Sequence, residues 1–274
     1  MPPRHEPDSL FFARQRWRYR DVIIVMSVIT VSQFVSLEGL TTVTGMWLWA
    51  INNGSTALLI IVSVWSVVRW KHRRPWRTLG FDPTTALYDI LWSLRSALGV
   101  VSVLAVFVLL MRLGDPDVRN AASATQRAVW QDHLGGFIAV VLVATVLTPI
   151  AEELFFRGLA YGPLFRKFGA AGATVGSAIL WAAAHYSGLS YASLGKTSVA
   201  LVLGLVYAEI YRRRESLVPT VVFHVVQNTT AFFIRDPHLV ILVPLASVLV
   251  GLWLMSVALF HVFNRSRASG TERG

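Results

Sequence analysis

Two adjacent carboxylates and an arginine stand within hydrophobic sequence at Glu152-Glu-Leu-Phe-Phe-Arg157. Residues four apart in an α-helix share a face, whereas neighbouring residues point about 100° apart. Glu153 is therefore predicted to pair with Arg157, which leaves Glu152 as a free carboxylate. A carboxylate in a pocket of low dielectric can take a proton from water near neutral pH and hand it on, which is the chemistry of a general base.

Two histidines and an asparagine are the other polar residues that stand out in apolar sequence. His224 and Asn228 are four residues apart, so they are predicted to share one helix face. An asparagine does not titrate, and beside a histidine it suits the binding of a carbonyl or a developing oxyanion. His185 follows Trp181 by one turn, so the indole is expected to pack against the imidazole. Together these groups suit amide hydrolysis by activated water.

Each of these residues, taken alone, also has a structural explanation. Charges at a helix end often extend to the membrane surface, and a single histidine often only packs or makes a hydrogen bond. An asparagine commonly links transmembrane helices. Ionisable residues inside a membrane are nevertheless costly and usually face a functional cavity. Their joint occurrence on three apolar segments favours one shared site.

The composition is that of a helical membrane protein. The chain has 274 residues, of which 54% are hydrophobic, and its mean hydropathy is +0.55. Its net charge of +10 resides mainly in the connections between apolar runs, so it indicates membrane topology and argues against a nucleic-acid partner. The absence of cysteine excludes disulfides, thiolate zinc sites and a cysteine nucleophile in this chain.

The predicted fold class is all-α, with about eight transmembrane helices. A spanning helix needs about 20 mostly apolar residues. By that measure, the candidate spans are residues 21–39, 55–70, 88–113, 134–156, 170–186, 197–211, 217–234 and 238–263. The longest polar connection follows residue 113, and residues 158–169 are expected to form a turn with a short interfacial helix.

The distribution of lysine and arginine predicts that both termini are cytoplasmic. With that orientation, nineteen of the 25 basic residues lie inside and five outside, while Arg95 falls within a span. An even number of spans agrees with this assignment. The expected localisation is the cell membrane, as a multi-pass protein with the lipid bilayer as its surroundings.

The predicted domain organisation has four parts. Residues 1–20 form a basic cytoplasmic segment, and residues 21–133 form the N-terminal spans and loops. Residues 134–234 form the catalytic core, and residues 235–274 form the last span and a cytoplasmic tail. Two further polar or small residues are given structural roles: Glu209 is expected to pair with Arg212 and Arg213, and Gly204 is expected to permit close helix packing.

These motifs resemble those of the CPBP family, the group of CAAX proteases and bacteriocin-processing proteins. The first family motif, two glutamates followed after three residues by an arginine, matches residues 152–157. The second, a phenylalanine before a histidine, is similar to Trp181-Ala-Ala-Ala-His185, with tryptophan in place of phenylalanine. The third matches His224-Val-Val-Gln-Asn228. The resemblance covers residues 134–234, less than half of the chain.

The resemblance implies an eight-helix fold with a cavity that opens to the cytoplasm, and an intramembrane endopeptidase. In that family, Glu152 and His185 would activate water, and Glu153 and Arg157 would orient the site. His224 and Asn228 would stabilise the oxyanion. A metal-free mechanism is favoured because no His-Glu-x-x-His sequence occurs. Zinc remains an alternative, with Glu152, His185 and His224 as its ligands.

Other functions stay open at this point. A catalytically silent member of the same family would act as a membrane scaffold or as a self-immunity protein against a secreted peptide. A transporter with a proton-relaying carboxylate would need internal repeats or broken helices, and neither is evident. A serine protease would rely on Ser177 and His185, which share one predicted span without a supporting motif. The expected substrate is a membrane-associated peptide or protein of unassigned sequence.

Overall fold

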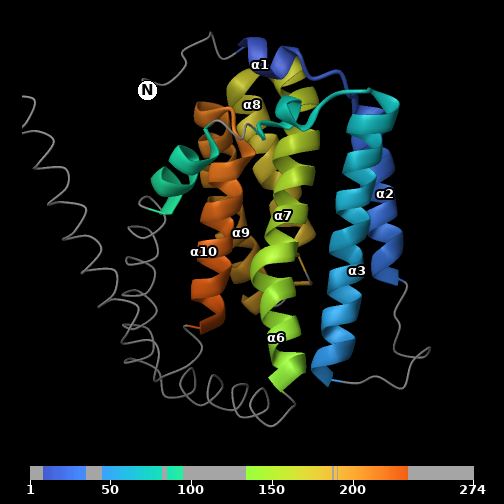
Figure 1. The fold of residues 1–274 in the computed structure, drawn as a ribbon, viewed down its shortest axis with the longest axis vertical. Coiled ribbons are helices and arrows are strands. Elements are labelled where there is room, and N and C mark those ends of the chain that lie inside the picture. The colour runs from blue at the N-terminus through green and yellow to red at the C-terminus, as the bar shows by residue number, and fades with distance from the viewer. Residues whose placement is uncertain are drawn as a thin grey trace, which may run out of the picture.

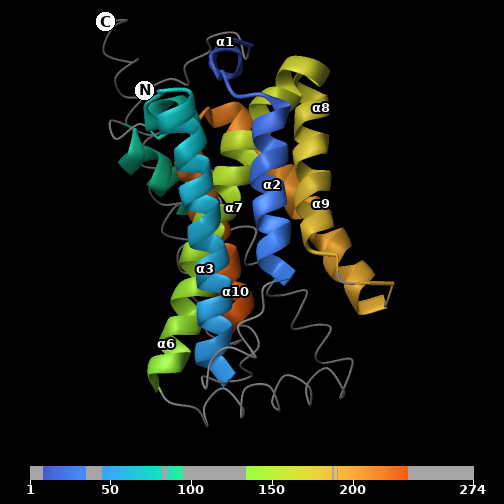
Figure 2. The ribbon, with the colours of Figure 1, turned by 90° about the vertical axis from the view of Figure 1, so that its right-hand side faces the viewer.

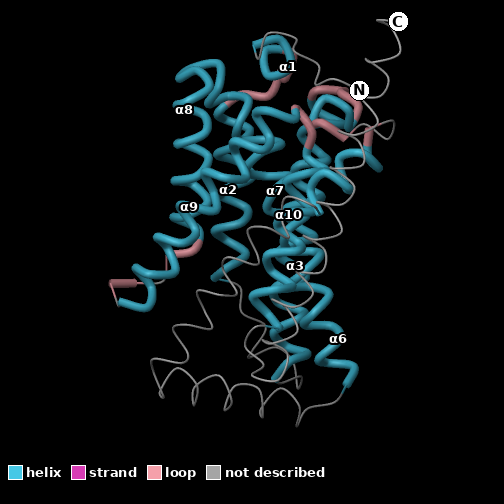
Figure 3. Tube along the Cα trace, turned by 90° about the vertical axis from the view of Figure 1, so that its left-hand side faces the viewer, coloured by secondary structure: helices cyan, strands magenta, loops and turns pink. Residues whose placement is uncertain are grey.

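A computed structural model describes residues 9–34, 45–81, 85–94, 134–186, 188–189 and 191–233. Within these ranges the chain is entirely helical apart from short connections, and no strand occurs (Figure 3). The predicted all-α class is therefore confirmed for this part of the chain. Among the described residues, three helices are long and apolar enough to cross a membrane: Gly45–Lys71, Gly135–Ala184 and Leu194–Arg214. The predicted span 238–263 and most of 88–113 lie outside the described residues.

The centre of the bundle is one nearly continuous helical segment that carries the glutamates. It consists of α6 (Leu134–Leu142), the π-helical turn η3 (Val143–Leu147), α7 (Thr148–Glu153) and a second π-helical stretch, η4 (Leu154–Ala160). It packs between α3 (Gly45–Trp65) and α10 (Leu217–Phe233), and Figure 1 shows these three roughly parallel. Residues from Leu154 to Ala160 are all buried. The glutamates are thus held at the centre of the bundle.

Proline explains the irregular turn before the glutamates. The backbone N–H of Thr148 donates to the carbonyl of Val143, five residues earlier. The next bond of this pattern would run from residue 149 to Ala144, but Pro149 has no N–H to donate. The carbonyl of Ala144 is therefore free for another donor. The π-helical turns could not be read from hydrophobic periodicity.

The remaining helices surround this centre. Helix α2 (Tyr19–Phe34) packs on α3, which continues into the π-helical η1 (Ser66–Lys71), and α8 (Tyr161–Ala184) packs against α9 (Tyr191–Arg214). Figure 2 shows α8 and α9 next to each other on one side of the bundle. Helix α8 is interrupted at Gly169, where φ is 70°. This positive φ suits glycine. Residues 158–169 were expected to form a turn with a short helix, but the chain stays helical from η4 into α8 and departs from helical geometry only at Gly169.

Two predicted helix starts are wrong: α9 begins at Tyr191 and not at residue 197, and the start of α3 differs by more. The second span was expected to begin at residue 55, but α3 begins at Gly45, because the polar residues of its first turns are accommodated within the helix. Asn53 Nδ2 donates to the carbonyl of Trp49 at 2.9 Å, and Ser55 also donates to a carbonyl four residues earlier. Gly54 faces the central helix, where an added Cβ would lie 3.4 Å from Val143.

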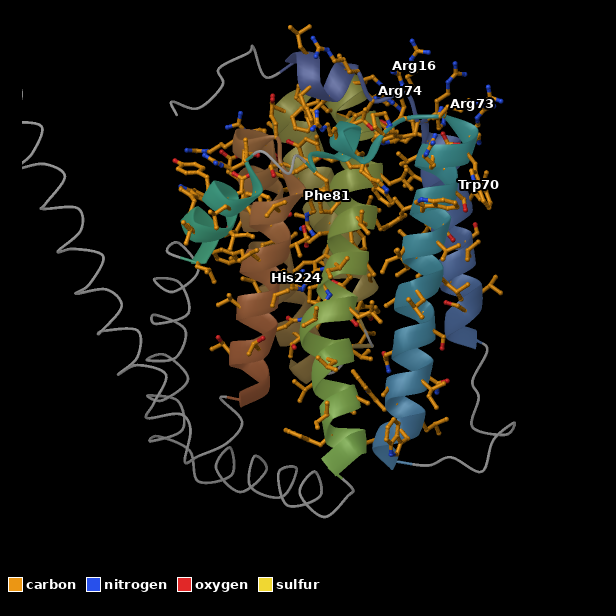
Figure 4. All side chains as sticks on the ribbon, in the orientation of Figure 1. Arg16, Trp70, Arg73, Arg74, Phe81 and His224 are labelled. Atoms are coloured by element: carbon orange, nitrogen blue, oxygen red, sulfur yellow. The ribbon has the colours of Figure 1, made fainter. Side chains whose placement is uncertain are left out.

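An N-terminal segment closes one end of the bundle. It comprises α1 (Ser9–Ala13) and the turn after it, with Phe12 and Trp17 fully buried. Gln15 Nε2 donates to the Thr78 carbonyl of η2 (Trp76–Leu79), and Arg166 donates to three carbonyls of the segment, those of residues 12, 15 and 17. Figure 4 shows Arg16, Arg73 and Arg74 at this same end. The end of the bundle that carries these arginines is therefore also covered by the packed N-terminal segment.

Candidate active site

The Glu153–Arg157 pair predicted from their spacing is present and fully buried. Arg157 Nη1 donates to Glu153 Oε1 at 2.9 Å, and both side chains are 0% exposed. Arg157 Nη2 donates to the Gly204 carbonyl at 3.0 Å, and its guanidinium lies over the rings of Trp181 and Tyr207, at 5.4 and 5.2 Å. The arginine thus joins the central helix to α8 and α9.

His224 completes this buried network from α10. Its Nδ1 lies 3.0 Å from Glu153 Oε1, and its Nε2 lies 3.9 Å from Glu152 Oε2. A carboxylate can only accept, so Nδ1 carries the hydrogen and donates to Glu153. Tyr207 stacks on the imidazole, with centroids 4.8 Å apart. The orientation of His224 is therefore fixed on two sides, and its Nε2 faces the second glutamate.

Glu152 occupies a different environment from its neighbour. Its side chain is 18% exposed, whereas that of Glu153 is 0% exposed. The indole Nε1 of Trp181 donates to Glu152 Oε2. No described residue donates to Glu152 Oε1. The two carboxylates therefore differ in exposure and in partners: Glu153 is fully buried and paired through Oε1, whereas Glu152 is partly exposed and bound through Oε2.

His185 ends α8 beside Trp181, as the one-turn spacing predicts. The two ring centroids are 4.5 Å apart, and His185 Nδ1 lies 2.9 Å from the Trp181 carbonyl. Because the carbonyl can only accept, Nδ1 carries the hydrogen and Nε2 is the available nitrogen. His185 is partly exposed. Among the described residues, His185 makes no hydrogen bond to either glutamate. It contacts the site through Trp181, whose indole binds Glu152.

Asn228 uses one amide N–H for structure. Its Nδ2 donates to the Ala144 carbonyl at 3.0 Å, the same carbonyl that Pro149 leaves without its helical partner. This bond ties α10 to η3. An amide group has two N–H donors, so a second remains for a ligand. Asn228 is thus both a link between helices and a candidate oxyanion donor.

Residues of α9 belong to the site although the sequence analysis did not place them there. Tyr207 stacks on His224 and donates through its hydroxyl to Gln227 Oε1 at 3.0 Å. Gly204, one turn earlier, supplies the carbonyl for Arg157. The spacing of Gly204, Tyr207 and Tyr211 on one helix face is the signal that could have indicated this surface.

Gly204 also sets the distance between α8 and α9, as predicted. A Cβ at this position would lie 3.0 Å from Ala178 Cα and 3.2 Å from Trp181 Cε3.

Gly204→Val should therefore move the helices apart, displace the carbonyl that binds Arg157, and lower the free energy of unfolding by about 1–3 kcal/mol. Thermal unfolding in detergent measures this effect. Gly195→Val is the matched control on the same helix, because no described atom lies within 4 Å of its added Cβ; an equal loss in both variants would contradict the packing role.

Two alternatives for the polar residues can be compared with the geometry. Ser177 is buried and its hydroxyl donates to the Phe156 carbonyl at 3.1 Å, a bond that suits helix packing. Glu209 pairs with Arg212 and Arg213 at 2.8 and 2.6 Å, as expected. Within the described part of the chain, no three His, Asp or Glu side chains are grouped so that they could hold a metal ion. Glu152, His185 and His224 are not gathered as such a group in this arrangement, and zinc remains the alternative cofactor.

The comparison with protein families agrees with the motif pattern. Residues 134–230 match the family described as type II CAAX prenyl endopeptidase Rce1-like. Residues 134–230 are thus similar to an Rce1-like domain of the CAAX protease type, consistent with the resemblance to the CPBP family. The matched residues hold all six predicted site residues. No curated protein and no solved structure matches the chain.

Proposed function

We propose that this protein is an intramembrane endopeptidase that hydrolyses a peptide bond of a membrane-associated protein or peptide. The observation that carries the proposal is the contrast between the adjacent glutamates: Glu153 is fully buried with Arg157 and His224, whereas Glu152 is partly exposed and its Oε1 accepts no hydrogen bond from the described residues. The match to a protease family over residues 134–230 supports the same reaction class.

Glu152 acts as the general base in this mechanism. Its carboxylate takes a proton from water, and the resulting hydroxide attacks the carbonyl carbon of the peptide bond. The C–O bond forms, the C–N bond then breaks, and Glu152 returns the proton to the leaving amine nitrogen. His185 assists with the water, because its Nδ1–H is held by the Trp181 carbonyl and its Nε2 is the nitrogen left to bind the water.

His224 and Asn228 stabilise the oxyanion of the tetrahedral intermediate. Glu153 accepts from His224 Nδ1. His224 donates to the oxyanion through Nε2 as an imidazolium, in which both ring nitrogens carry a hydrogen. The second N–H of Asn228 is the other donor. Glu153 and Arg157 orient the site and touch no substrate.

The proposed topology has eight spans, both termini in the cytoplasm and a site open to that side. It is supported by the basic end of the bundle, where α1 and the exposed arginines Arg16 and Arg73 gather (Figure 4). His224 lies about midway along α10 in the same view. Residues 134–234 would form the catalytic core in the cell membrane.

A comparison of membrane-associated peptides tests the proposed function. Cells that lack the protein should accumulate an uncleaved peptide, and the wild-type chain should restore its cleavage while Glu152→Gln should not. Synthetic versions with and without a prenyl group on cysteine would then define the substrate class. Identical peptide profiles in all three strains would contradict the proposal and favour a silent scaffold.

The metal-free mechanism predicts that chelation leaves cleavage unchanged. The physical reason is that the proposed base takes its proton from water directly, and that Glu152, His185 and His224 are not gathered as a metal-binding group among the described residues. The measurement is the cleavage rate of purified protein after dialysis against a strong chelator, with a known zinc protease as the positive control. Loss of activity that added zinc restores would establish the alternative site.

A further inference from the structure

Trp181 is the residue around which the polar groups of the site are arranged. Its indole is 3% exposed and donates to Glu152 Oε2. The ring centroids of His185 and His224 lie 4.5 and 5.4 Å from it, and the Arg157 guanidinium lies 5.4 Å from it. A single side chain of α8 therefore contacts groups from the central helix and from α10.

The hydrogen bond from the indole distinguishes the two oxygens of Glu152. Oε2 is bound by Trp181 and faces His224 Nε2 at 3.9 Å. Oε1 receives no hydrogen bond from the described residues. A glutamate has three side-chain torsions, and without a fixed oxygen the carboxylate would be free to rotate in this partly exposed position. The indole N–H removes that freedom.

We propose that Trp181 is a positioning residue that fixes the general base through its indole N–H. The bond commits Oε2 to the protein and leaves Oε1 as the oxygen that takes the proton from water. Phenylalanine, which occupies this position in the second motif of the CPBP family, packs as a ring but has no N–H to donate. The inference rests on the proposed function of Glu152. It assigns a role to the indole N–H of Trp181, a group that the phenylalanine of the family motif lacks.

Trp181→Phe removes the indole N–H and keeps a smaller aromatic ring at the same position. Loss of a hydrogen bond to a charged group should lower kcat about tenfold or more. KM should stay the same, since the indole contacts the base and not the substrate. Unchanged kcat would overturn the proposal, and so would an increase in KM without a fall in kcat.

Trp17→Phe is the matched control. Trp17 is also fully buried, but its Nε1 has no hydrogen-bond partner among the described residues. The same chemical change at this position should leave kcat and KM as they are in the wild type. Equal losses of kcat at both positions would mean that the effect is a general consequence of replacing a buried indole, which overturns the proposal.

A double-mutant cycle tests the hydrogen bond without any activity measurement. Thermal unfolding in detergent is compared for the wild type, Trp181→Phe, Glu152→Met and the double variant. Trp181→Phe should lower Tm in the wild-type background and lower it by less in the Glu152→Met background, where the acceptor is already gone and only the packing of the ring is lost. Equal shifts in both backgrounds would overturn the inference. Coupling in a protein that cleaves no peptide would support the hydrogen bond and contradict the proposed function.

Discussion

Glu152→Gln should abolish peptide cleavage while the protein stays folded. Glutamine keeps the size of the side chain, and its amide oxygen can accept from Trp181, but it cannot take a proton from water. Loss of a general base typically lowers kcat by about 10²–10⁴-fold. The measurement is kcat on a membrane-associated peptide with protein reconstituted in liposomes, accompanied by Tm in detergent.

Glu209→Gln is the control for a glutamate on the bundle that takes no part in the site. Glu209 is paired with arginines near the end of α9, with its side chain 35% exposed. Its replacement should leave kcat unchanged. Residual activity in Glu152→Gln equal to that of the wild type would contradict the assignment of the base.

Glu153→Gln should lower the stability of the protein as well as its activity. The change leaves Arg157 without its counter-ion in a site where both side chains are fully buried, and it weakens the bond from His224 Nδ1. Removal of one partner of a buried ion pair typically costs about 3–5 kcal/mol. The measurement is Tm in detergent, together with the amount of monodisperse protein that can be purified from membranes.

Two comparisons identify the cause of that loss. The double variant Glu153→Gln with Arg157→Met removes the uncompensated charge, so it should recover part of the stability without recovering activity. Glu209→Gln removes a surface partner of the same residue type and should cost less than about 1 kcal/mol. If Glu153→Gln has the same Tm as Glu152→Gln, the separate roles of the two glutamates are wrong.

The sequence predicted those parts of the site that depend on helix spacing. Glu153 and Arg157 are four residues apart on one helix and form the expected ion pair. Trp181 and His185 are likewise one turn apart and in contact. Such contacts follow from the geometry of one helix, whatever the rest of the fold does.

Contacts between helices were not predictable in the same way. His224 was expected to work with Asn228, but its Nδ1 binds Glu153 and the Asn228 amide binds the Ala144 carbonyl. Both bonds depend on how α10 packs against the central helix and on the carbonyl that Pro149 leaves free. The contribution of Tyr207 depends in the same way on the packing of α9, which no motif specified.

The helical class and most helix positions also followed from hydrophobicity, because apolar runs of spanning length have few alternatives to helix. The start of α3 did not, since Asn53 and Ser55 satisfy their side chains within the helix. The π-helical turns that flank α7 also escaped prediction, because they change the hydrogen-bond register without changing the apolar pattern.

The most direct test of the proposed reaction is cleavage of a membrane-tethered peptide in liposomes by wild-type protein and by Glu152→Gln at equal Tm, with the products identified by mass spectrometry. The proposed mechanism predicts two peptide fragments with the wild-type protein and none with the variant. Identical fragments from both proteins would contradict the role of Glu152, and no fragments from either, on the peptide that accumulates in deletion cells, would contradict the protease function itself.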